Sequence, residues 1–402
     1  MSMNVQPDLE FIKDMKSAGG DTLKKCFQCA TCSVVCPLSS DDNPFPRREM
    51  IFAQWGLKDK LMGDANVMLC HQCGDCTAYC PRGAKPGDVL GAIRAYVYKS
   101  LGWPPGLAKL CSSGKNLPIL IGIPAVIILV LWIISGGMHI PSTEEFAHAG
   151  YGHFFGHWNF RLLAKNVFFI DLIMLPAAGL AAYAAYKGVK AMWDMMAANA
   201  GVEDALYRPS VPQFVKEFLW PSLVEIVQHE RFKKCTANKD RVRGHLPLLL
   251  SFLGLFFVTV YSAFSQDVLG IFIPSLHGPM SLFNPVKIGA NVAAIALIVG
   301  IGILWGNRSK MEAEGQASRT FYDWFLIWLI MGVGVTGLGA ELLRLIGIAS
   351  LGYLVYYLHL VSVMMLFLYM PYTKFAHMVY RTFAMAFERY RDSAYVKNPL
   401  ND

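Results

Sequence analysis

The sequence has few charged residues and a large apolar fraction. Only 16% of its residues are Asp, Glu, Lys or Arg, whereas 54% are hydrophobic and the mean hydropathy is +0.37. This composition excludes a chain that is soluble throughout. The sequence also has no apparent nucleophile triad, phosphate-binding loop or dinucleotide fingerprint, so no substrate reaction of its own is indicated. Residues 1–15 lack the apolar core and cleavage site of a secretory signal, and we expect residues 1–110 to stay in the cytoplasm.

Cysteine occurs ten times, mostly in two identical runs. Both runs read C-x2-C-x2-C-x3-C-P, the ligand spacing of bacterial ferredoxins with two 4Fe–4S clusters. Zinc ribbons use paired CxxC motifs, and a disulfide framework would not need the same run twice. In such ferredoxins the fourth cysteine of each run reaches across to the other cluster. The expected ligand sets are therefore Cys26, Cys29, Cys32 and Cys80 for one cluster, and Cys70, Cys73, Cys76 and Cys36 for the other.

The other two cysteines, Cys111 and Cys235, lie far apart in the sequence, beside expected membrane boundaries. No disulfide framework is indicated, which is typical of a reducing compartment.

Six later stretches are long enough to cross a bilayer core, which takes about 20 helical residues. They are Leu117–Ser135, Val167–Tyr186, Leu246–Ser265, Val286–Trp305, Phe321–Leu343 and Tyr353–Tyr372. Lys and Arg concentrate in residues 187–243, in residues 308–319 and after residue 373, which predicts that both termini lie on the cytoplasmic side of the inner membrane. The net charge of +7 follows from this orientation and indicates no nucleic-acid partner.

The expected fold class is a ferredoxin-like helical and loop domain with two 4Fe–4S clusters, fused to an all-α bundle of six transmembrane helices. The expected divisions are a cytoplasmic cluster domain (1–110), an additional transmembrane pair (111–190), a cytoplasmic connection (191–244), a four-helix haem domain (245–380) and a cytoplasmic tail (381–402). His229, in the connection, is expected to be exposed.

Histidines in the apolar half are candidate cofactor ligands, because ionisable side chains at membrane depth are usually functional. His359 and His377 are 18 residues apart, which is five turns and about 27 Å on one helix, so we expect them on one face. His245 opens the third span at the level of His377. Two such imidazoles are suited to the axial positions of a b-type haem. The alternative is that both histidines are interfacial residues wetted by lipid headgroups.

Two segments carry a family resemblance. GHLPLLLSFLGLFFV, residues 244–258, and HLVSVMMLFLYMPYTKFAH, residues 359–377, resemble the haem-ligand helices of the cytochrome b subunit of respiratory nitrate reductases and their relatives. The resemblance implies an inner haem between His245 and His377, and an outer haem on His359. In these relatives a second histidine on the helix of His245 is the other ligand of the outer haem, and Leu255 stands at that position here. A replacement partner would come from His139, His148, His153, His157 or His277; otherwise residues 139–160 form an amphipathic interfacial segment with solvated histidines.

The N-terminal motifs narrow the resemblance. CFQCATCSVVCP and CHQCGDCTAYCP, followed by RGAKPGDVLGAIR, resemble the cluster subunit of heterodisulfide reductases, here joined to a cytochrome b domain. The whole arrangement resembles the membrane subunits of quinone-interacting membrane-bound oxidoreductase (Qmo) complexes. That resemblance implies two soluble flavin and iron–sulfur partner subunits, menaquinol as electron donor and adenylylsulfate reductase as acceptor. A heterodisulfide or sulfite-type complex, the quinone-reducing direction, and a redox sensor or membrane anchor are the alternatives.

A quinol site requires polar groups at membrane depth. Lys287, in NPVKIG, resembles the quinol-binding lysine of nitrate reductases, or else it is a snorkelling anchor. Glu341 and Arg344 lie three residues apart, on one face of the expected fifth helix. They form either a proton path or an ion pair that holds helices together. If the protein binds only the inner haem, an outer quinol site has no electron acceptor beside it. The quinol site is then expected nearer to His245.

Overall fold

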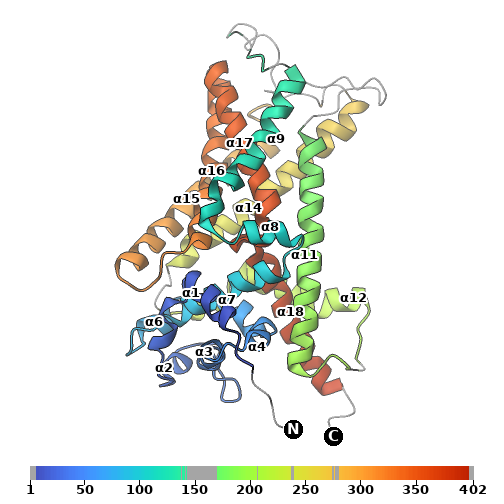
Figure 1. Cartoon of the computed structure of the whole chain (residues 1–402). Coiled ribbons are helices and arrows are strands. Elements are labelled where there is room, and N and C mark those ends of the chain that lie inside the picture. The colour runs from blue at the N-terminus through green and yellow to red at the C-terminus, as the bar shows by residue number, and fades with distance from the viewer. Residues whose placement is uncertain are drawn as a thin grey trace.

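The computed structural model describes residues 6–136, 138–140, 142, 170–205, 207–236, 240–273, 276 and 280–397. Within these ranges every regular element is a helix. Short helices gather at one end of the molecule, and long helices extend away from that end (Figure 1). His148, His153, His157 and His277 lie outside the described residues, so the predictions made for them stay predictions.

The cysteine runs lie in the region of short helices. This region contains α1 (Leu9–Ser17), η1 (Asp21–Lys25), α2 (Thr31–Val34), α3 (Arg47–Gln54), α4 (Lys58–Met62), α5 (Ala65–Leu69), α6 (Asp75–Ala78), α7 (Pro86–Leu101) and α8 (Pro105–Leu110).

Both runs adopt the same local conformation. Gln28 and Ala30 have φ of 60° and 68°, and the equivalent Gln72 and Gly74 have φ of 52° and 94°. Left-handed residues of this kind turn successive N–H groups toward the inside of a loop, a geometry that suits anions and iron–sulfur groups.

The last helix, α18 (His377–Lys397), is part of the core of the cluster region. Tyr380, Ala384 and Phe387 lie one helical turn apart and are each at most 1% exposed. They join Ile93 of α7 and Met192 of the long helix α11 (Asp171–Ala200) in one hydrophobic cluster. The predicted boundary at residue 380 therefore falls inside a continuous helix. The residues predicted as a cytoplasmic tail contain a buried apolar stripe, because this helix needs one face to pack on the core.

Six helices are long and apolar enough to cross a membrane, as the hydropathy pattern predicts. They are α9 (Leu117–Gly136), α11 (Asp171–Ala200), α14 (Arg241–Ala263), α15 (Pro285–Ala313), α16 (Phe321–Leu345) and α17 (Ala349–Tyr369). α11 continues past its predicted end to reach the cluster region, where Asn199 Nδ2 donates to the carbonyl oxygen of Lys60 at 3.0 Å. Short elements complete the fold: η2 (Gly114–Asn116), α12 (Val211–Phe214), η3 (Val215–Leu219), α13 (Trp220–Gln228), η4 (Arg231–Lys234), η5 (Phe264–Val268) and η6 (Leu269–Ile271).

Close packing of α14 on α15 places the start of α14 accurately. A Cβ on Gly300 would lie 2.8 Å from the carbonyl oxygen of Gly244, and one on Gly244 would lie 3.0 Å from that of Gly300. Only glycine permits this approach, as is usual where membrane helices cross closely. Because His245 follows Gly244, the crossing also positions the histidine.

The helix predicted to carry both His359 and His377 is broken. α17 ends at Tyr369, η8 (Met370–Tyr372) follows, and Thr373 is extended with φ −109° and ψ −178° before η9 (Lys374–Ala376). Pro371 lacks the N–H that a continuing helix needs. The expectation that both histidines share one face of one helix was therefore wrong, and His377 begins a separate helix.

Candidate cofactor sites at the junction of the two regions

The structure brings the cysteines of each predicted set together. The thiol of Cys32 interacts electrostatically with Cys26, Cys29 and Cys80. The thiol of Cys76 does so with Cys70, Cys73 and Cys36, and also with Cys32 of the other set. Burial and the neighbouring thiolates raise the pKa of Cys32 to about 11 and that of Cys36 to about 12. Thiols gathered in this way need a bound cation to ionise together, which is the chemistry of a metal site.

The two sets differ in exposure. The first, which we call the outer set, has Cys29 exposed, and Phe27 and Val34 beside it are 66% and 85% exposed. The second, the inner set, contains Cys76, which is only 8% exposed. A cavity is lined by all four inner cysteines, and Cys235 and His71 also line it. The inner set is therefore enclosed more deeply, whereas the outer set lies partly open at the surface.

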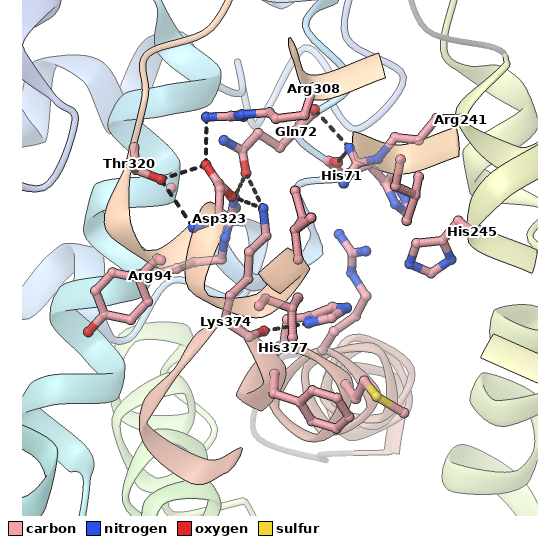
Figure 2. A pocket seen from close by; sticks show the side chains of 18 of the residues that line it. His71, Gln72, Arg94, Arg241, His245, Arg308, Thr320, Asp323, Lys374 and His377 are labelled. Atoms are coloured by element: carbon pink, nitrogen blue, oxygen red, sulfur yellow. Dashed lines mark hydrogen bonds and ion pairs between the residues drawn. The ribbon is translucent and has the colours of Figure 1, made fainter. Parts of the chain in front are cut away.

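A second cavity, of about 180 Å³, lies between the cluster region and the long helices. Figure 2 shows it with His245 and His377 on its wall. The centroids of these two imidazole rings are 6.4 Å apart, with 66° between the ring planes. Two histidines that are far apart in the sequence therefore meet. His245 lies in the third long helix, as expected, whereas His377 begins α18 instead of ending the sixth long helix.

Hydrogen bonds leave one nitrogen of each ring free. His377 Nδ1 donates to the carbonyl oxygen of Lys374 at 2.5 Å. His245 Nδ1 lies 2.8 Å from His229 Nε2, and His229 Nδ1 lies 3.2 Å from the Val227 carbonyl oxygen. Since that carbonyl only accepts, His229 donates from Nδ1, accepts at Nε2, and fixes the proton of His245 on Nδ1. Among the described residues, Nε2 of His245 and of His377 has no hydrogen-bond partner.

His229 was predicted to be exposed, and this prediction was wrong. It is 5% exposed, because the turn after α13 folds back against the start of α14. Burial lowers the pKa of His229, and burial with the nearby Arg381 lowers the pKa of His377 to about 3. Both rings are therefore neutral at physiological pH. No signal in the sequence distinguishes His229 from a surface histidine, because its partner lies 16 residues away across a turn.

His71 lies between the two cavities and lines both of them. It follows Cys70 directly, and its ring packs edge-on against Phe232 with centroids 4.8 Å apart. Phe232 in turn stacks on His245 at 5.3 Å. Both ring nitrogens of His71 are buried and find no hydrogen-bond partner in the described part of the chain. Burial together with nearby arginines strongly lowers the pKa of His71. Aromatic rings thus connect the inner cysteine set with the histidine pair.

Three arginines from distant elements hold the loop that carries Cys70. Arg94 donates to the carbonyl of Val67 at 2.9 Å, Arg241 to that of His71 at 2.9 Å and Arg381 to that of Cys70 at 2.6 Å. These guanidinium groups form no ion pair among the described residues, so they leave positive charge between the cavities. That charge favours an anionic occupant.

An ion-pair network lies at the polar end of the histidine cavity (Figure 2). Asp323, 5% exposed, pairs with Arg308 at 2.7 Å and with Lys374, and Thr320 donates to it at 2.6 Å. Burial lowers the pKa of Lys374 to about 8, although Asp323 opposes that shift. Because Lys374 belongs to this network, the network holds in place the interruption between α17 and α18, after which His377 lines the cavity.

The predicted quinol residues meet at the far end of the long helices. Lys287 Nζ on α15 pairs with Glu341 Oε2 on α16 at 2.7 Å, and Asn291 Nδ2 donates to Oε1 at 3.2 Å. Arg344 lies one turn further along α16. Glu341 thus pairs with Lys287 across two helices.

His359, the predicted outer haem ligand, packs on α16. Its Nδ1 lies 3.2 Å from the Val333 carbonyl oxygen and 3.2 Å from Thr336 Oγ1. A Cβ on Gly337 would lie 3.0 Å from its Cε1. His359 therefore rests directly on the α16 backbone.

Two known families match separate parts of the chain. Residues 22–84 match the 4Fe-4S dicluster domain family, and residues 228–395 match the citrate utilization protein B family. The second match includes His229, His245 and His377.

The chain is also similar to individual proteins of known name. The chain is 42% identical over 117 residues to the C subunit of the H(2):CoB-CoM heterodisulfide,ferredoxin reductase of Methanothermobacter marburgensis, and equally to that of Methanothermobacter thermautotrophicus. Each alignment covers 28% of this chain and spans 63% of the relative's length. It is 38% identical over 107 residues to citrate utilization protein B of Escherichia coli, covering 26% of this chain and 27% of that protein. No solved structure is significantly similar. The chain therefore joins a 4Fe-4S dicluster domain, homologous to the C subunit of heterodisulfide reductases, to a helical region similar to citrate utilization protein B.

Proposed function

We propose that this chain is the membrane electron-transfer subunit of an oxidoreductase complex. It would hold a haem b between His245 and His377 and two 4Fe–4S clusters in the outer and inner cysteine sets. Menaquinol is the proposed donor, and two soluble flavin and iron–sulfur subunits are the proposed next carriers. The observation that carries the proposal is the pair of half-buried imidazoles that meet on one cavity, each with a free Nε2 atom.

The residues present fit a haem. Metal–imidazole bonds are about 2.0–2.1 Å long, so two rings on opposite sides of one iron have centroids about 6–6.5 Å apart. The observed separation is 6.4 Å. Each Nδ1 is held by a hydrogen bond, the usual support for a metal-ligating histidine. The surplus positive charge of Arg94, Arg241 and Arg381 suits the carboxylates of a haem.

The cysteine sets fit iron–sulfur clusters for the reasons given above: four converging thiols each, on loops whose N–H groups turn inward. When bound, the haem and clusters supply one-electron transfer. The chain's own contribution is position: Phe232 and His71 lie between His245 and the inner set, and the outer set lies at the surface where a partner can reach it.

For the quinol, we propose Lys287, Glu341 and Arg344 as binding and proton-accepting residues. Lys287 can donate a hydrogen bond to a quinol oxygen, and the Glu341 carboxylate can accept a proton. The second candidate is the polar end of the histidine cavity, at Asp323 and Lys374, which lies beside the proposed haem. A Glu341→Gln variant that raises the KM for a soluble naphthoquinol favours the first site. An unchanged KM favours the second.

We further propose, from the resemblance to Qmo membrane subunits, that the chain works in the inner membrane with adenylylsulfate reductase as the final acceptor. The matched relatives are named as parts of heterodisulfide reductases, so a disulfide-reducing complex is the alternative. Whether quinol is oxidised or quinone reduced follows from the potentials of the bound groups.

The decisive experiment is a count of cofactors in the purified protein. The expected result is one b haem per chain by the pyridine method, with about eight iron atoms in clusters. Two haems would require a partner for His359. Absence of haem would refute the electron-transfer role of the membrane helices.

A further inference from the structure

A fifth thiol borders the inner cysteine set. Cys235 lines the same cavity as Cys36, Cys70, Cys73 and Cys76, although it lies far from all of them in the sequence. Its Sγ, the Sγ of Cys73 and a carboxylate oxygen of Asp75 lie within 4.8 Å of one another. The Cys235 thiol therefore faces the Cys73 thiol across this cavity. It is 2% exposed, so solvent does not compete for this contact.

The chain after Cys235 is tied at two points to residues 71–75, in the loop that carries Cys73. The N–H of Thr236 donates to Asp75 Oδ2 at 2.9 Å, which fixes the residue after the thiol. Arg241, a few residues further on, donates to the carbonyls of His71 and Gln72. The thiol is therefore held against Cys73 by the connection that leads into α14.

We propose that Cys235 is a positioning residue for the inner cluster, donating its S–H to the sulfur of Cys73 without ligating iron. The inference rests on the proposed function, which supplies the cluster. Four cysteines already match the four irons of a 4Fe–4S cluster, so the fifth thiol is left as a donor. Uptake of one electron makes the cluster more negative, and a hydrogen bond to a ligand sulfur stabilises that state more than the oxidised one. Cys235 keeps its proton throughout, and no bond is made or broken.

The predicted consequence is that the reduction potential of the inner cluster is higher with the Cys235 thiol than without it. Hydrogen bonds to sulfur are among the factors that set cluster potentials. The outer set has no such fifth thiol among the described residues.

The test is a redox titration followed by electron paramagnetic resonance on the full-length protein in detergent. Cys235→Ala and Cys235→Ser are compared with Cys111→Ala, which removes the other cysteine outside both sets, itself fully buried. We expect Cys235→Ala to lower the midpoint of one cluster only, with iron and haem contents unchanged. Cys235→Ser, which keeps a hydrogen-bond donor, is expected to lower that midpoint less. Cys111→Ala is expected to leave the midpoint unchanged. If the alanine variant does not accumulate, the serine variant carries the test.

Four results would overturn the inference. The first two are an unchanged midpoint in Cys235→Ala and an equal shift of the midpoints of both clusters. The third is an equal shift of the midpoint in Cys111→Ala. The fourth is a loss of about four irons per chain in Cys235→Ala, which would make Cys235 a ligand. Wild-type protein without cluster signals would instead refute the proposed function, and the inference with it.

Discussion

Replacing His229 by phenylalanine should weaken haem binding without removing a haem ligand. Phenylalanine keeps the ring that packs near Phe232 but removes the nitrogen that accepts from His245 Nδ1 at 2.8 Å. The His245 N–H would then be buried without a partner.

The size of the effect follows from that lost hydrogen bond. An unsatisfied buried donor costs about 1–3 kcal/mol. Since about 1.4 kcal/mol is tenfold in an equilibrium constant, haem affinity should fall by about 5- to 150-fold. Loss of outer-shell partners at metal sites typically costs about 10–100-fold, which agrees.

The assay is haem transfer from the purified protein to excess apomyoglobin, followed optically. His229→Phe should lose haem faster than wild type, and His229→Gln, whose amide oxygen still accepts, should lie between them. Gln228→Ala changes the exposed neighbouring residue and serves as the negative control. His245→Ala should bind no haem at this site. Haem retention by His229→Phe within twofold of wild type would refute the hydrogen-bond chain that we derive from the structure.

Three further predictions concern other parts of the molecule. Cys32→Ala and Cys76→Ala should each remove about four irons, from different clusters, as measured by iron analysis and paramagnetic resonance; loss of the same signal in both would contradict the two sets. Burial and Asp64 raise the pKa of Glu49 from 4.5 to about 8, so the folded state keeps a proton that the unfolded state releases, and thermal stability should fall as pH rises through this window. Glu49→Gln should abolish that fall. Gly300→Val forces a side chain against the Gly244 carbonyl and should destabilise the protein by about 1–3 kcal/mol and reduce haem content, whereas Gly302→Val, whose Cβ meets nothing within 4 Å, should do neither.

The sequence alone determined the features that depend on local spacing and composition. Cysteine spacing predicted that the first three thiols of each run gather, because a tight loop places neighbouring residues on one centre whatever surrounds it. The fourth member of each set was expected from the likeness to two-cluster ferredoxins. Hydropathy predicted the six long helices, because crossing a bilayer requires a continuous apolar run. His245 and His377 were identified from their positions at the ends of such runs.

Tertiary structure decided everything that depends on contacts between distant segments. The break at residues 370–376 redirects His377, since Pro371 and the Asp323 network outweigh helical continuity. His229 and Cys235 carry no motif, and their places beside the sites arise only when the connection after α13 packs on the cysteine loops. His71 lies inside a cysteine motif, but only this packing brings Phe232 and His245 against it. Long-range packing selects these neighbours, and a one-dimensional pattern holds no trace of it.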